Sequence, residues 1–120
     1  MTTTTLTIPL ETGWLVDDHD GEPTPTALSA WRGDGREARL TRTFTLAPID
    51  FCVSYLLLVD RVPAGTLAAV NGQSVGEIGD KARVDVTDIV ALGGNTLTFR
   101  VEPGASGAFS GVRLQAIPCE

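Results

Sequence analysis

Four acidic side chains gather around one glycine near the N-terminus. Asp17, Asp18, Asp20 and Glu22 surround Gly21. Clustered carboxylates are the hard oxygen ligands that Ca²⁺ prefers, but the ion needs about six to eight oxygens and this spacing is not that of an EF-hand. The cluster therefore predicts a solvated acidic loop, with a calcium site as the alternative.

A tryptophan with charged neighbours occupies segment 31–36. Trp31 is followed by Arg32, Asp34 and Arg36. The apolar face of a pyranose stacks on an indole ring, and nearby charged groups can hydrogen-bond its hydroxyls. Because loops commonly carry binding residues, we take these four side chains as candidate carbohydrate ligands. The alternative is that Trp31 only fixes its loop to the core.

One arginine is predicted on an apolar strand face. Arg42 alternates in phase with Leu40, Phe44 and Leu46 along the expected strand 39–46. A cation among apolar side chains needs a carboxylate partner or an opening to solvent. An ion pair or a solvent-reaching position is therefore expected, and a ligand contact is the alternative.

Residue patterns for catalysis are absent. His19 is the single histidine, and the sequence GAFSG at 107–111 misses the nucleophile-elbow spacing by one residue. Neither cysteine belongs to a Cys-x-x-Cys pair, so a zinc site is not expected. These observations predict a protein that is not an enzyme and needs no cofactor, calcium excepted.

The two cysteines allow one bridge. Cys52 lies in an apolar run, where a free cysteine usually packs as a small buried side chain, and Cys119 is the penultimate residue. We expect two reduced thiols in a cytoplasmic protein, with a disulfide as the alternative. The expectation of a cytoplasmic location also rests on the N-terminal sequence, which has no secretory-signal pattern.

Composition limits the partners. The chain has 120 residues, 9 basic and 15 acidic, with a net charge of −6. Its length predicts one domain over 1–120. Its acidity argues against binding to nucleic acid or to an anionic membrane, because both need a positive surface. No apolar stretch approaches the roughly 18 residues of a spanning helix.

The apolar pattern is that of short strands. Apolar and polar residues alternate over 39–46 and 95–102, as in half-buried strands. The Asn71-Gly72 pair predicts a type I′ hairpin. Segment 51–59 is apolar on both faces, as in a central strand whose second face must also be covered. Segment 17–36 reads as a long irregular loop, and 88–92 as one helical turn. About eight strands at this spacing predict an all-β antiparallel sandwich with Trp14 in its core.

The order of motifs resembles the sugar-binding domain of glycoside hydrolase family 2. No single motif is specific, but their order and spacing match from about residue 40 to 114. The matching segments are RTFTL (42–46), YLLLV (55–59), AVNGQSVGE (69–77), VDVTDIV (84–90), GNTLTFRV (94–101) and SGVRL (110–114).

This resemblance implies a galactose-binding-like jelly roll and an accessory role. The family's catalytic carboxylates lie in a separate barrel, so none transfers to this chain. The leading hypothesis is a non-catalytic module that binds carbohydrate, alone or for a glycoside hydrolase. The alternative is a structural or interaction protein that binds a partner protein or forms a homo-oligomer without a sugar site, which the doubly apolar strand 51–59 would favour.

Overall fold

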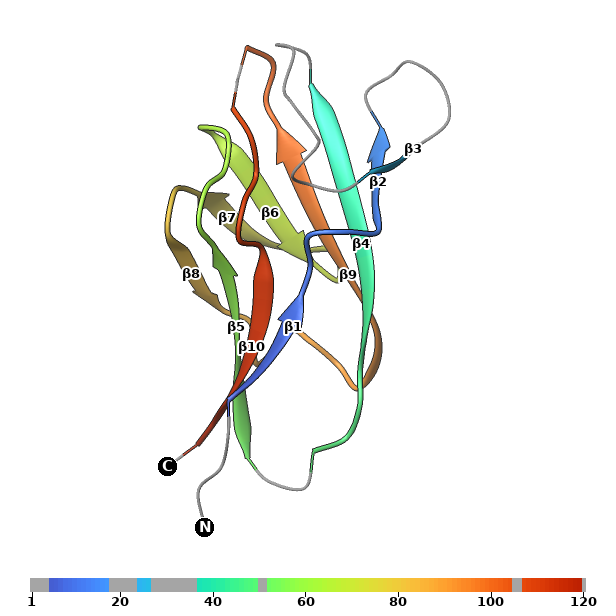
Figure 1. The fold of residues 1–120 in the computed structure, drawn as a ribbon, viewed down its shortest axis with the longest axis vertical. Coiled ribbons are helices and arrows are strands. Elements are labelled where there is room, and N and C mark those ends of the chain that lie inside the picture. Colours follow the sequence, from blue (N-terminus) through green and yellow to red (C-terminus); the bar gives the residue numbers. More distant parts are fainter. Residues whose placement is uncertain (1–4, 18–23, 27–36, 50–51, 105–106, 120) are drawn as a thin grey trace.

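The protein is a two-sheet antiparallel β-sandwich (Figure 1). The computed structural model describes residues 5–17, 24–26, 37–49, 52–104 and 107–119. Within these ranges every regular element is a strand. No helix in the described ranges is long and apolar enough to cross a membrane. The predicted all-β sandwich is confirmed.

Four strands form one sheet and six form the other. The smaller sheet has the order β1 (Leu6–Pro9), β10 (Arg113–Pro118), β5 (Val53–Val59), β8 (Ala82–Asp85). The larger sheet has the order β3 (Thr24–Thr26), β2 (Trp14–Asp17), β4 (Ala38–Leu46), β9 (Gly93–Val101), β6 (Thr66–Val70), β7 (Gln73–Ile78).

The core lies between the sheets and is built around three stacked aromatic rings. The ring centroids of Trp14 and Phe99 are 5.0 Å apart, and those of Phe99 and Phe109 are also 5.0 Å apart. All three side chains are buried, and the Trp14 indole N–H donates a 2.6 Å hydrogen bond to the Leu10 carbonyl. That bond satisfies the polar end of a ring that the core otherwise desolvates. The prediction for Trp14 is confirmed.

The doubly apolar strand β5 is an interior strand of its sheet, as predicted. Tyr55, Leu57 and Val59 are buried in the core. On the opposite face, Leu56 is only 8% exposed in the single chain. Leu56 is therefore covered without a second subunit.

One local prediction is wrong, and the bounds of another are shifted. A short strand, β3, lies within the segment expected to be loop throughout, and it pairs with β2 at the sheet edge. Proline has no backbone N–H, and Pro25 is tolerated there because an edge strand does not need a hydrogen bond from every backbone N–H. The single turn expected at 88–92 is present but begins two residues earlier, since Ile89 and Val90 both donate to the Val86 carbonyl.

The expectation of reduced thiols is also wrong, because Cys52 and Cys119 form a disulfide. β5 and β10 are antiparallel neighbours with Val53 opposite Pro118, so the next pair outward is Cys52 and Cys119. The Cys119 N–H also donates to the Cys52 carbonyl over 2.9 Å. Cys52 is exposed rather than buried, because it precedes the strand.

Candidate binding site

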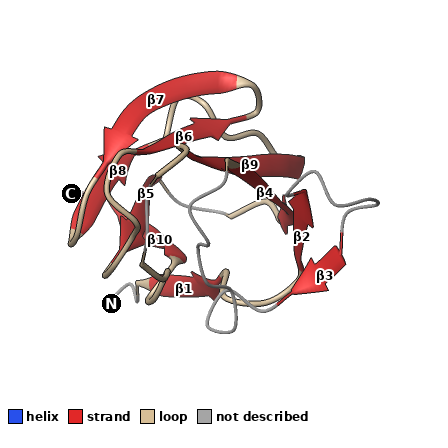
Figure 2. Cartoon of the chain, turned by 90° about the horizontal axis from the view of Figure 1, so that it is seen from above, coloured by secondary structure: helices blue, strands red, loops and turns tan. Residues whose placement is uncertain are grey.

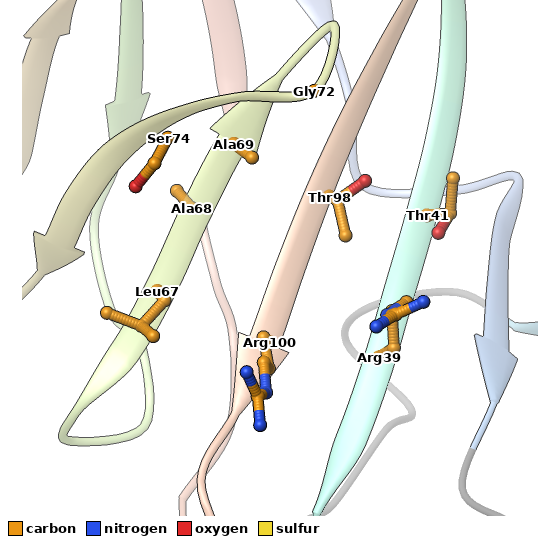
Figure 3. Close-up of a pocket in the computed structure, with 9 residues that line it drawn as sticks. All are labelled: Arg39, Thr41, Leu67, Ala68, Ala69, Gly72, Ser74, Thr98 and Arg100. Carbon is orange, nitrogen blue, oxygen red and sulfur yellow. The ribbon is translucent and has the colours of Figure 1, made fainter.

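A pocket of about 400 Å³ opens on the outer face of the six-stranded sheet (Figure 3). It lies over β4, β9 and β6 and reaches the start of β7. The lining residues are Arg39, Thr41, Leu67, Ala68, Ala69, Gly72, Ser74, Thr98 and Arg100.

Strand register places the lining side chains in two rows. In one row Arg39 lies opposite Arg100, which lies opposite Leu67. In the next row Thr41 lies opposite Thr98, which lies opposite Ala69. Because side chains alternate across a sheet, the intervening residues of the same strands face the core. The chain therefore builds the pocket and one wall of the core from the same three strands.

Small side chains and a bent strand make the hollow. Ala69 and Thr98 are short side chains in the row next to the longer side chains of Leu67 and Arg100, so the surface is lower there (Figure 3). The pairing of β6 with β7 carries an irregularity at Ala68/Ala69, and β7 curls over β6 on the outer side of the sheet (Figure 2). A bulge bends and twists its strand, so β7 forms a wall rather than continuing the flat surface.

The hairpin that carries this wall is held by an asparagine network. Asn71 and Gly72 both have positive φ, 52° and 80°, as the predicted type I′ turn requires. The Asn71 side-chain amide donates to the Ile89 carbonyl and to Asn95 Oδ1, while its Oδ1 accepts from the Thr96 N–H at 2.8 Å. Asn95 is 3% exposed. The network fixes the β6–β7 hairpin against the start of β9.

The described lining residues supply two guanidinium groups and no carboxylate. Arg100 Nε donates to Glu37 Oε1 over 3.0 Å, with side chains 47% and 35% exposed. Arg39 makes no ion pair with another described residue. Asp17 lies opposite Arg39 on β2 and Glu77 opposite Leu67 on β7, so acidic groups flank the first row without lining the pocket.

Arg42, a predicted ligand residue, lies elsewhere. It is on the inner face of β4, half-buried, and its Nε donates to the Thr12 carbonyl over 2.7 Å. Its Nη1 donates to the Thr43 carbonyl. A Cβ on Gly13 would lie 3.2 Å from Arg42 Nε, so the side chain packs against the crossing from β1 to β2. Of the two expected arrangements, an ion pair or a solvent-reaching position, the half-buried guanidinium fits the second, and it donates to backbone carbonyls.

The other predicted site residues fall mostly outside the described ranges. Trp31, Arg32, Asp34 and Arg36 lie there. So do Asp18, Asp20 and Glu22 of the expected calcium loop, while Asp17 ends β2. Among the residues that the structure describes, no group of three or more potential ligands is placed to hold a metal ion.

Sequence reasoning missed the pocket although it placed its polar residues correctly. The alternation predicts that Arg39 and Thr41 share one outward face, and that Thr98 and Arg100 share another. The sequence does not show that these two strands, which are far apart along the chain, pair with each other, nor in which register they pair. No local motif carries that information.

Comparison with known proteins supports the fold. The sequence matches no family model and no curated protein. Among solved structures, an FMN-binding β-glucuronidase from Facaelibacterium prausnitzii L2-6 superposes with a TM-score of 0.69 at 20% identity, over 95% of this chain and 23% of that one. The β-glucuronidase of Ruminococcus gnavus, solved with uronic isofagomine, gives 0.71 at 10% identity, over 98% of this chain and 29% of that one.

These matches define the class of fold. At such identities the likeness concerns the fold alone, and the chain spans about a quarter of each of these enzymes' length. The sandwich is therefore of a kind that occurs as one part of a larger β-glucuronidase.

Proposed function

We propose that this chain is a non-catalytic β-sandwich module that binds carbohydrate and serves a glycoside hydrolase as an accessory module. The pocket on the outer face of the six-stranded sheet is the proposed binding site. The observation that carries the proposal is this pocket, on a fold that forms about a quarter of two β-glucuronidases.

The chemistry of the lining suits a sugar. Thr41, Thr98 and Ser74 offer hydroxyls that both donate and accept, and the two arginines add donors, as a polyhydroxylated ligand requires. The volume of about 400 Å³ is within the range of small-molecule sites, roughly 300–1,000 Å³.

The same lining supports a binding rather than a catalytic role. Glycoside cleavage generally uses two carboxyl groups about 5–10 Å apart. Among the described residues that line the pocket there is no Asp, Glu, His or Cys side chain. A group able to shuttle a proton at neutral pH is therefore missing from its lining.

Binding by the full chain to a panel of oligosaccharides, measured by isothermal titration calorimetry, tests the proposal. The pocket-filling variant Ala69→Phe should weaken binding about tenfold or more. Thr43→Phe is the matched control, because Thr43 lies on β4 outside the lining. If the wild-type chain binds no member of the panel, the proposal is wrong.

A third variant separates the pocket from the other candidate ligands. Trp31→Ala tests the candidate ligands predicted from the sequence, Trp31, Arg32, Asp34 and Arg36, which lie outside the described residues. If Trp31→Ala abolishes binding and Ala69→Phe leaves it unchanged, the module binds carbohydrate but through those residues. The proposed position of the site would then be wrong, while the proposed function would stand.

A further inference from the structure

We propose that the pocket selects a short saccharide carrying a carboxylate, a uronic acid unit, through Arg39 and Arg100. This inference rests on the proposed carbohydrate-binding function and deepens it. The observation that carries it is the direct opposition of these two arginines on β4 and β9.

Opposed arginines are unusual on a sheet surface. Side chains directly opposite in an antiparallel pair have Cβ atoms about 4.5–5.5 Å apart, and like charges there are destabilising. Both arginines are exposed. An anion bound between them would remove the repulsion, and a carboxylate matches the planar donors of a guanidinium in a bidentate manner.

No described residue of the pocket lining offers a carboxylate to the two arginines. Glu37 engages Arg100 through Nε, which leaves the terminal nitrogens of that guanidinium outside the pair. Exposed ion pairs of this kind contribute little to stability, so a ligand can displace this one at small cost. The carboxylates of Asp17 and Glu77 flank the row but do not line the pocket.

The positions of the charged and the hydroxyl side chains define the orientation of a bound ligand. Figure 3 shows the two guanidinium groups at one end of the pocket and the side chains of Thr98, Thr41 and Ser74 toward the other. The Ser74 hydroxyl accepts from the Gly76 N–H at 3.2 Å and so keeps its own O–H for donation. A ligand with a carboxylate at one end and hydroxyls at the other fits this arrangement.

Size and net charge favour a short ligand. The pocket volume, about 400 Å³, lies near the lower end of the range for ligand sites. The chain carries a net charge of −6, which repels long polyanions outside the pocket. A single uronic acid unit or a short uronide is therefore expected to bind better than an extended acidic polymer.

The test compares ligands with and without a free carboxylate. Digalacturonic acid and its methyl ester are titrated into the full chain by calorimetry, with a sulfated disaccharide as a third probe. The acid should bind about tenfold more tightly than the ester, and the preference should shrink with added salt. Arg39→Gln and Arg100→Gln should each reduce the preference. Arg83→Gln, an exposed arginine on β8 of the other sheet, should leave it unchanged.

Each outcome has a distinct meaning. Equal affinity for acid and ester would overturn the inference while leaving the proposed function intact. A sulfated probe that binds as tightly as the acid would overturn carboxylate selection. If neither these probes nor any neutral oligosaccharide binds, the proposed function fails as well.

Discussion

The side-chain amide of Asn71 donates a 2.9 Å hydrogen bond to the side-chain oxygen of Asn95. The first residue sits in the hairpin between β6 and β7, and the second is buried in β9. Asn95 also accepts from the Ala91 N–H and donates to the Ala91 and Gly93 carbonyls. The buried amide of Asn95 therefore holds both the connection from β8 to β9 and the β6–β7 hairpin in place.

Replacing Asn95 with alanine should destabilise the fold. The change leaves polar groups of Asn71 and Ala91 without partners, and we expect a loss of about 3 kcal/mol in the free energy of unfolding. Asn71→Gly is the control, since glycine keeps the positive φ and removes fewer bonds, at a cost of about 1 kcal/mol. Urea denaturation measures both. Equal stability of Asn95→Ala and the wild type would contradict the network's role.

Removing one of the opposed arginines should stabilise the ligand-free protein. Arg39→Thr relieves the repulsion with Arg100 and places a strand-favouring residue on β4, for an expected gain of about 0.2–1 kcal/mol. The gain should diminish at high salt, because exposed charges are screened. Chemical denaturation at low and high ionic strength measures it. A loss of stability would show that Arg39 has a structural role instead.

Reduction of the disulfide should cost more than any of these substitutions. The bridge joins residues separated by 67 positions, and the chain-entropy relation gives about 4 kcal/mol for a loop of that length. Denaturation with and without dithiothreitol measures the loss, and the Cys52→Ser/Cys119→Ser variant should not respond to the reductant. An unchanged midpoint for the reduced wild type would contradict a bridge that contributes to stability.

Asp85 makes stability depend on pH in the acidic range. Hydrogen bonds from the Thr87 hydroxyl and backbone N–H lower the pKa of this carboxyl below its usual value of 3.8. A lowered native pKa stabilises the fold above the unfolded pKa, and that contribution is lost as the pH falls through the native value. The difference in stability between wild type and Asp85→Asn should be present at neutral pH and vanish as the pH falls through the lowered native pKa of Asp85. A difference that grows on acidification would contradict this.

The sequence predicts the strands well because burial alternates along them. The side chains of Leu97, Phe99 and Val101 are 1% exposed or less. The exposed or half-buried residues between them face outward, as the pattern in the sequence indicates. The Asn71-Gly72 hairpin is also predictable, because its two positive φ values require those residue types. Both features depend only on residues close together in the sequence.

Features that depend on distant pairing could not be predicted. Phe109 lies in a glycine-rich segment without strand periodicity, yet it stacks on Phe99 in the core. The Cys52–Cys119 bridge follows from β5 lying beside β10, and the pocket from β4 lying beside β9 and β6. A single sequence shows which way each side chain points on its strand but not which strand is its neighbour.

Backbone amide chemical shifts, followed while digalacturonic acid is titrated into the full chain, test the proposed site most directly. If the pocket binds the ligand, the largest shifts will fall on the outward residues of β4, β9 and β6, with Thr41, Thr98 and Arg100 prominent among them. Shifts confined to the four-stranded sheet or to 27–36, or no shifts at saturating ligand, would contradict the account.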